Sequence, residues 1–537
     1  MKKNWILVVL TLCIFAAGVA PLAQAQADPQ QPPATQPPAQ QGRPQGEGRG
    51  GAQQAEPPPK EEWSVTEGTA RVAGAAIPYK ASAGTTLLKN DAGEPIGLMY
   101  SVAYTRSDVK DLSTRPVAFF YNGGPGSSTM WLHMGSFGPK RIQVSNSEFT
   151  PPAPYKIVDN AETLLDKTDL VFIDAMGTGF SRAAGKGTDR DFYGVDEDAD
   201  AFGRFIVEYI SRNERWNSPK FLMGESYGTF RSAVLGNLLQ SRYGMQLNGI
   251  ALISSVLDLS SLTFGAGDDR PYIYYLPSYA AVAWYHKALK QRPAALEPFL
   301  DEARKFAAGE YAAALFKGDH LTAAEKSAVA KRLSYFTGLS EDYLLRADLR
   351  VTLGEFNVEL QRAKGLTSGR IDARFVGYTN DLLSQNAQGD PFNNAVAGAF
   401  FAAVNHYTRT MLKFAPDRPY FNSRRGGGWN WNRAPGGGGP GGGGGGFPGA
   451  PNVQNDLKQA MIANPRLQVQ VENGYFDMAT PFFPTEFTMS HLGLHPDLQK
   501  NIKLNYYQSG HMMYIHDSDR SAQRASLAEF IDRATKQ

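Results

Sequence analysis

The sequence predicts an α/β fold in which a mostly parallel central sheet carries helices on both faces. Short apolar runs of strand length alternate with amphipathic stretches of helical period, which is the pattern of such folds. The predicted strands are 117–121, 170–173, 221–223, 250–254, 467–471 and 502–506. The clearest predicted helices are 196–212, 229–242 and 520–535.

A long stretch rich in Ala, Leu and Tyr separates the fourth and fifth predicted strands. Its helical spacing predicts a helical insertion over 261–454, a lid or cap on a domain formed by 61–260 and 455–537. The insertion ends in a glycine-rich segment, 425–451, which we interpret as a mobile surface loop. A phosphate-binding loop is the alternative, but no strand precedes this segment and no Lys-Ser/Thr follows it.

The N-terminus has the pattern of an export signal. Two lysines precede an apolar run, and small residues follow it, so we predict a signal peptide over 1–27. A retained membrane anchor is the alternative, but it needs about 20 apolar residues, more than this run offers. Residues 28–60 are rich in Pro, Gln and Gly, and they predict a disordered tether.

Cysteine content and charge narrow the function classes. The only cysteine, Cys13, lies inside the predicted signal, which excludes a thiol nucleophile or a cysteine metal site in the exported protein. Export without disulfides favours a bacterial periplasmic or secreted protein. With 54 Lys and Arg against 52 Asp and Glu, the net charge of +2 gives no reason to expect nucleic acid or an anionic membrane as partner. No His/Asp/Glu set has metal-ligand spacing, so we expect neither metal nor cofactor.

A candidate nucleophile lies between a predicted strand and a predicted helix. Gly224-Glu225-Ser226-Tyr227-Gly228 has the pattern G-x-S-x-G. The two glycines permit the tight turn that exposes a serine hydroxyl at the N-terminus of the following helix, as in α/β-hydrolases. We therefore predict an α/β-hydrolase fold with Ser226 as nucleophile.

A second glycine-rich loop follows the strand at 117–121 and reads Asn122-Gly123-Gly124-Pro125-Gly126. In this fold the loop after that strand supplies one amide of the oxyanion hole, and the residue after the nucleophile, here Tyr227, supplies the other. A plain turn is the alternative.

Serine needs a base and a carboxylate that orients it. His511 follows the last predicted strand after Gly510, and it is preferred over His516. Asp477 follows the penultimate strand and is preferred over Glu472 at the strand end.

These motifs resemble those of the serine carboxypeptidase family. The match rests on residues 122–128, 177–181, 224–228, 473–477 and 510–512, in that order along the chain. The resemblance implies removal of C-terminal residues from peptides, with Ser226, Asp477 and His511 as triad and Gly124 and Tyr227 as oxyanion-hole donors.

The resemblance also implies that Asn122 and Glu225 bind the free C-terminal carboxylate of a peptide substrate. Two carboxyl groups hydrogen-bond only if one is protonated, which predicts that acid favours binding. The chain departs from the family at Ser127, where cysteine is usual, and at Ser136, where many members carry a glutamate that supports carboxylate recognition. His133 is a possible compensating cation, although a buried structural role is the simpler interpretation. An esterase or acyltransferase of the same fold and a non-catalytic binding protein are the alternatives.

Overall fold

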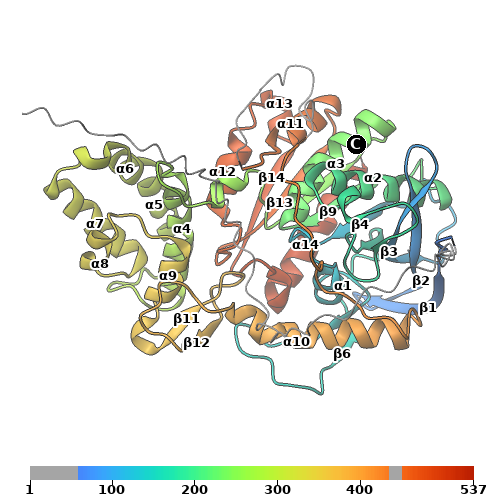
Figure 1. The fold of residues 1–537 in the computed structure, drawn as a ribbon, viewed down its shortest axis with the longest axis horizontal. Coiled ribbons are helices and arrows are strands. Elements are labelled where there is room, and N and C mark those ends of the chain that lie inside the picture. The colour runs from blue at the N-terminus through green and yellow to red at the C-terminus, as the bar shows by residue number, and fades with distance from the viewer. Residues whose placement is uncertain (1–57, 434–449, 537) are drawn as a thin grey trace, which may run out of the picture. The chain divides into compact units, whose positions relative to one another are not determined.

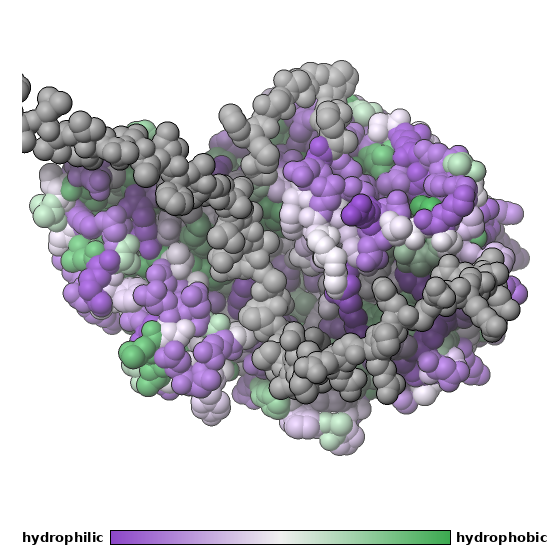
Figure 2. All heavy atoms as spheres, viewed as in Figure 1, coloured by the Kyte–Doolittle hydropathy of each residue, from purple (hydrophilic) through white to green (hydrophobic). Residues whose placement is uncertain are grey.

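The computed structural model describes residues 58–433 and 450–536. The predicted signal peptide 1–27, residues 28–57 of the predicted tether and residues 434–449 of the glycine-rich loop lie outside the described residues. In the part that is described, no helix is long and apolar enough to cross a membrane. The face shown in Figure 2 is largely hydrophilic, with hydrophobic side chains in small scattered groups.

The core of the molecule is a sheet in the order β1-β2-β3-β7-β4-β9-β10-β13-β14 (Figure 1). Strands β7, β4, β9, β10, β13 and β14 are mutually parallel, and each predicted strand lies within or next to one of them. Their bounds are β4 Val117–Tyr121, β7 Asp169–Ile173, β9 Lys220–Glu225, β10 Gly249–Ile253, β13 Gln468–Gly474 and β14 Ile502–Tyr507. Strand β7 lies between β3 and β4, so the chain order reverses there.

Three antiparallel strands extend the sheet at its N-terminal edge, and the apolar runs did not predict them. They are β1 Trp63–Val72, β2 Ala75–Lys89 and β3 Pro95–Arg106. Strand β1 alternates exposed and partly buried residues, which is typical of an edge strand with one covered face. Strand β3 pairs with β7 in antiparallel register and joins this edge to the parallel part.

Helices cover both faces of the sheet, which confirms the predicted fold class. Side chains of β4 alternate between two cores: Phe120 packs in the core that includes Phe530, and Phe119 packs in the core that includes Phe202. Helix α14 (Asp517–Thr535) contributes to the first core, and helices α2 (Val195–Arg212) and α3 (Tyr227–Tyr243) to the second. Strands β4, β9 and β10 are buried along their whole length because each face of the sheet is covered there.

The described chain between β10 and β13 is rich in helices. The described α-helices are α4 Arg270–Tyr285, α5 Leu296–Phe306, α6 Ala312–Lys317, α7 Ala323–Thr337, α8 Glu341–Arg346, α9 Leu353–Glu359, α10 Pro391–His406 and α11 Gln454–Ala463. A short hairpin of β11 (Leu366–Ser368) and β12 (Val376–Tyr378) precedes α10. Side chains of α4 to α9 form a third core, which also contains Tyr475, Phe476 and Met478 from the loop after β13. The insertion thus packs directly on the loop that carries Asp477.

Candidate active site

Ser226 occupies a strained turn between β9 and α3. Its backbone has φ 60° and ψ −129°, a conformation that residues other than glycine rarely adopt and that costs about 1–3 kcal/mol. A methyl group on Gly224 would lie 2.2 Å from the carbonyl oxygen of Gly228, so the turn tolerates only glycine there. The Ser226 amide donates to the Ile253 carbonyl at the end of β10 at 2.9 Å, and its side chain is partly exposed.

The glycine-rich loop after β4 lies against this turn. A methyl group on Gly123 would be 2.3 Å from the backbone nitrogen of Tyr227, so the two segments are in close backbone contact. Gly124 has φ +109° and is exposed next to this contact. The loop therefore sets the backbone of Gly124 beside the N-terminus of α3, where amide groups and the helix dipole favour negative charge.

Asp477 and His511 form a buried hydrogen-bonded pair. The carboxylate Oδ2 lies 2.8 Å from His511 Nδ1. The same oxygen accepts from the Thr480 hydroxyl at 2.8 Å, and Oδ1 accepts from the amides of Ala479 and Thr480 at 2.8 and 2.9 Å. Burial lowers the pKa of His511, but Asp477 and the more distant charge of Glu225 outweigh burial and hold this pKa above the usual value for imidazole.

The end of β10 is hydrogen-bonded to both Ser226 and His511. Ile253 accepts the Ser226 amide, and the hydroxyl of the next residue, Ser254, donates to the His511 carbonyl at 2.6 Å. Between the two side chains themselves, both of which are described, the structure contains no hydrogen bond. Catalytic hydrogen bonds are often long without substrate and shorten only in the complex.

Asn122 and Glu225 are also brought together. The side-chain amide of Asn122 donates to Glu225 Oε1 at 2.6 Å. The backbone amide of Leu132 donates to Asn122 Oδ1 at 3.0 Å, and this second bond fixes the orientation of the Asn122 side chain. Glu225 Oε2 makes no hydrogen bond of ordinary geometry, although the Tyr514 hydroxyl lies beside it. Burial raises the pKa of Glu225 to about 7, despite the opposing effect of His511. This carboxyl group therefore changes protonation near neutral pH.

The side chains of Ser136 and His133 both make contacts inside the protein core. Ser136 stands where the sequence resemblance leads one to expect a glutamate, and His133 is the candidate cation that would compensate for its absence. Ser136 is fully buried and donates its hydroxyl to the Leu132 carbonyl at 2.5 Å at the end of helix α1 (Met130–Gly135). His133 lies in the core, stacks on Phe172 and bonds the Tyr104 hydroxyl through Nε2 at 2.7 Å. Burial lowers the pKa of His133 to about 3, so it is neutral and offers no cation.

The alternative acid and base lie apart from the Asp477–His511 pair. Glu472 is buried and bonds Tyr507, Gln470 and Asn505. The imidazole of His516 pairs with Asp519 at 3.1 Å on helix α14's first turn.

A segment of the insertion that the sequence motifs missed holds both loops of the Asp477–His511 pair. We call residues 370–374, between β11 and β12, the clasp. The His511 amide donates to the Ile371 carbonyl at 2.8 Å, and the Met478 amide donates to the Arg370 carbonyl at 3.1 Å. Asp372 Oδ2 accepts the Gly510 amide at 3.2 Å and forms a buried ion pair with Arg374 at 2.6 Å.

Residues at the start of the glycine-rich segment pack on the loop after β4. Ser423 pairs with Ser127 in an isolated antiparallel β-bridge, and the backbone amide of Arg424 donates to the Gly126 carbonyl at 2.8 Å. The ring of Trp429 meets the Tyr227 ring edge-to-face at 5.6 Å. The described part of this segment, up to residue 433, therefore packs against the loop after β4 and against the side chain of Tyr227.

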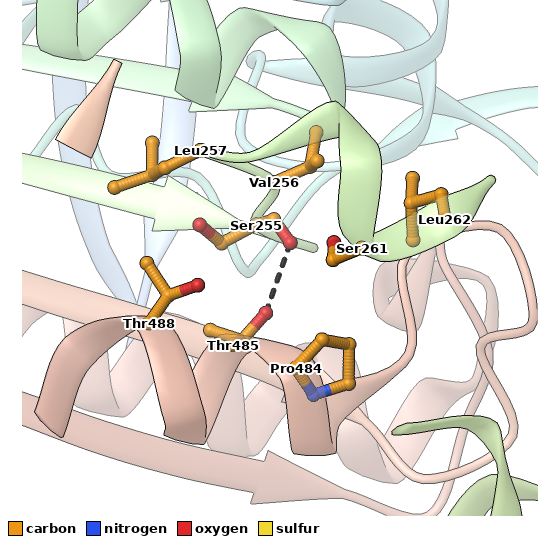
Figure 3. Close-up of a pocket in the computed structure, with 8 residues that line it drawn as sticks. All are labelled: Ser255, Val256, Leu257, Ser261, Leu262, Pro484, Thr485 and Thr488. Atoms are coloured by element: carbon orange, nitrogen blue, oxygen red, sulfur yellow. Dashed lines mark hydrogen bonds between the residues drawn. The ribbon is translucent and has the colours of Figure 1, made fainter. Parts of the chain in front are cut away.

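A small polar cavity lies between the end of β10 and helix α12 (Phe482–Ser490) (Figure 3). Its volume is about 10 Å³, which is room for about one water molecule. The Thr485 hydroxyl, on the helix side, donates to the Ser255 carbonyl at 3.0 Å across it. The cavity is too small for a peptide side chain. Among the described residues, no group of three or more His, Cys, Asp or Glu is placed to hold a metal ion.

Comparison with known proteins agrees with the motifs. Residues 97–297 match the model of the serine carboxypeptidase family, a stretch that includes Asn122, Glu225 and Ser226 but ends before Asp477 and His511. The match supports the interpretation of this chain as a hydrolase of the serine carboxypeptidase type. No curated protein matches the chain.

Solved structures resemble the chain at low identity. A prohormone-processing carboxypeptidase from Saccharomyces cerevisiae is 14% identical, with 84% of this chain and 91% of that chain covered and a TM-score of 0.49. A proline iminopeptidase from Mycobacterium smegmatis is also 14% identical, with 84% and 99% covered and a TM-score of 0.36.

Proposed function

We propose that this chain is a serine carboxypeptidase that releases C-terminal residues from peptides through an acyl-enzyme on Ser226, and that acid favours its substrate binding. The observation that carries the proposal is the buried Asn122–Glu225 pair directly beside Ser226. A general esterase has no need for a carboxyl group with a pKa of about 7 next to its nucleophile. A peptide with a free C-terminus gives that group a ligand.

The proposed chemistry follows from the hydrogen bond at His511 Nδ1. Because Asp477 accepts that N–H, Nε2 is left as the base that takes the Ser226 proton while Oγ attacks the scissile carbonyl carbon. The amides of Gly124 and Tyr227 stabilise the oxyanion. His511 then gives its proton to the leaving amine, the C–N bond breaks, and water attacks the acyl-enzyme by the same path to regenerate Ser226.

Glu225 and Asn122 recognise the substrate terminus in this proposal. Below a pH of about 7 the Glu225 carboxyl is protonated and donates to the substrate carboxylate. Above that pH the two anions repel each other. Substrate affinity should therefore rise as the pH falls through 7.

The same acidification works against the base. Glu225 raises the pKa of His511, and His511 lowers that of Glu225, so the two groups titrate as a coupled pair. The productive form has neutral His511 and protonated Glu225. A bound substrate carboxylate favours that form, because its charge stabilises a proton on Glu225. We expect a bell-shaped pH profile with its acid limb set by His511.

An esterase or acyltransferase of the same fold is the second candidate. Ser136 favours it, since this neutral and fully buried side chain stands where many family members carry a glutamate that supports carboxylate recognition. In that case the acyl group passes to water from an ester, or to an alcohol.

The proposed function also involves the helical insertion and the N-terminal segment. We propose that the insertion between β10 and β13 forms a cap that shapes the substrate site, because the core of its helices α4 to α9 shares residues with the Asp477 loop. Export to a bacterial periplasm or the medium is proposed from the N-terminal sequence alone. A non-catalytic binding protein is the least supported alternative.

The deciding experiment compares a blocked dipeptide with its C-terminal amide and ester between pH 4.5 and 8. Preference for the free carboxylate, strongest at low pH and weakened by Asn122→Ala, supports the carboxypeptidase. Turnover of the amide or ester that equals or exceeds that of the acid at neutral pH would contradict it. Ser226→Ala should lose activity under either enzymatic hypothesis, so it controls for contaminating peptidases.

A further inference from the structure

Arg370, the first residue of the clasp, carries a positive charge close to the candidate active site and has no direct ion-pair partner among the described residues. Its side chain is exposed, and within residues 58–433 and 450–536 its guanidinium makes no ion pair and no hydrogen bond. Most arginines in the insertion do pair, as Arg350 does with Asp269 at 2.7 Å and Arg374 with Asp372 at 2.6 Å. Arg370 is therefore available to a ligand.

The backbone of Arg370 is fixed between the loops that carry Asp477 and His511. Its carbonyl accepts the amide of Met478, the residue after Asp477, at 3.1 Å. The carbonyl of the next residue, Ile371, accepts the amide of His511 itself at 2.8 Å. These two bonds place the Cα of Arg370 beside the pair, and a long guanidinium side chain extends several Å from there.

The charge of Arg370 acts on groups around the site. It lowers the pKa of His511 and opposes the burial that raises the pKa of Tyr275 on helix α4. Asp390 also interacts with this charge, because Arg370 opposes the burial that raises the pKa of Asp390, but the oxygens of Asp390 accept their hydrogen bonds from backbone amides. Oδ2 accepts from Arg370 and Ile371 at 2.9 and 3.0 Å, and Oδ1 accepts from Phe392 at 2.8 Å. Asp390 thus holds the backbone of the clasp and leaves the guanidinium free.

We propose that Arg370 binds a carboxylate of the peptide substrate and so helps to determine which peptides the enzyme accepts. The inference rests on the proposed function and deepens it. Two sources supply this chemistry: the terminal carboxylate of every substrate, and the side chain of a C-terminal Glu or Asp. Guanidinium and carboxylate groups match in charge and in bidentate geometry.

The surroundings explain what such a cation adds. Ser136 and His133 are both neutral, and Glu225 donates a hydrogen bond to a carboxylate only when it is protonated. Arginine keeps its charge over the whole working range of pH. Arg370 therefore supplies, near the Asp477–His511 pair, a positive charge that attracts a carboxylate at neutral pH.

The test measures KM and kcat for three blocked dipeptides that differ only in the C-terminal residue: Phe-Ala, Phe-Gln and Phe-Glu. Arg370→Gln removes the charge and keeps a shorter, polar side chain, whereas Arg370→Lys keeps the charge. Arg466→Gln is the matched control, because Arg466 is also exposed but precedes β13, at the opposite end of the strands from the site. Loss of one charged hydrogen bond should raise KM about tenfold, with a smaller change in kcat.

The pattern across the three peptides identifies the carboxylate. A similar rise in KM for all three in Arg370→Gln, partly reversed in Arg370→Lys, assigns Arg370 to the terminal carboxylate. A rise confined to Phe-Glu assigns it to an acidic side chain. If KM for all three peptides stays within twofold of the Arg466→Gln control, the inference is wrong while the carboxypeptidase stands. If the unmodified enzyme cleaves none of the three, the proposed function itself fails.

Discussion

Two buried carboxyl groups near Ser226 differ in how far their hydrogen-bonding capacity is filled. Asp477 accepts hydrogen bonds on both oxygens, from two amides, the Thr480 hydroxyl and His511. Glu225 accepts one hydrogen bond of ordinary geometry, from Asn122, and its other oxygen is left to the neighbouring Tyr514 hydroxyl. Protein donors therefore fill the hydrogen-bonding capacity of Asp477, whereas that of Glu225 is only partly filled.

This difference separates two functions that a buried carboxyl group performs. A carboxylate surrounded by donors is held in one orientation and in turn orients an imidazole, as Asp477 does for His511. A buried carboxyl group with too few donors has a raised pKa, about 7 for Glu225, and gains a proton with which to bind another carboxylate. The same isosteric change, carboxylate to amide, should therefore have very different consequences at the two positions.

The largest effect is expected for Asp477→Asn. The amide cannot accept the His511 N–H in the same way, so the imidazole adopts the wrong tautomer and kcat should fall about 10⁴-fold. KM should change little, because Asp477 does not contact the substrate carboxylate in the proposed complex. Steady-state kinetics with a blocked dipeptide measure both values.

Glu472→Gln is the control for this change, since Glu472 is equally buried on β13 and bonds other partners. It should retain kcat within a few-fold. A loss of 10³-fold or more in Glu472→Gln, with Asp477→Asn nearly active, would mean that the acid has been assigned to the wrong residue.

The next effect concerns what keeps the Asp477–His511 pair rigid. Asp372→Asn leaves the buried guanidinium of Arg374 without its partner and weakens the bond to Gly510 beside His511. Removal of one member of a buried ion pair costs about 3 kcal/mol of unfolding free energy. We expect that loss in chemical denaturation, together with a reduced kcat at unchanged protein concentration.

Asp342→Asn provides the comparison, because Asp342 pairs with Arg346 on the exposed surface of α8 at 3.0 Å. Exposed pairs contribute about 0–1 kcal/mol. If both variants lose the same small amount of stability, the clasp does not support the site.

The sequence predicted the parts of the fold that are buried on both sides and the residues that sit at strand ends. The apolar run 117–121 coincides with β4, because every residue of that strand is fully buried. The geometry also brings Asp477 to His511 and Asn122 to Glu225 from positions 34 and 103 residues apart. These pairs were predictable because the carboxyl ends of parallel strands meet at one edge of a sheet.

Other features depend on contacts that no local pattern encodes. Strand β1 is half exposed and gains its stability from ten paired positions with β2, not from an apolar run. The clasp bonds His511 through the main chain of Ile371, 140 residues away, and a backbone carbonyl has no signature in the sequence. Asp372 and Arg374 are two charges in a helical insertion, where exposure is the ordinary expectation for such residues.

The smallest of these effects, and the most specific, is expected for Glu225→Gln. Glutamine donates an N–H at every pH, so KM at pH 5 should rise only about fivefold relative to the unmodified enzyme. Above pH 7 the unmodified enzyme carries an anion that repels the substrate carboxylate, and the variant does not, so the variant should have the lower KM there. The two plots of KM against pH should therefore cross near the Glu225 pKa of about 7.

The acid limb of kcat supplies an independent check in the same variant. Glu225 raises the pKa of His511, so its neutralisation should lower that pKa and move the acid limb to lower pH. Glu472→Gln changes another buried glutamate, one that bonds Tyr507 and does not contact His511. In this control variant the pH dependence of KM and that of kcat should both stay unchanged. A KM that still falls steeply below pH 7 in Glu225→Gln would assign the titrating group to another residue, and the contrast between the two carboxyl groups would then lose its functional meaning.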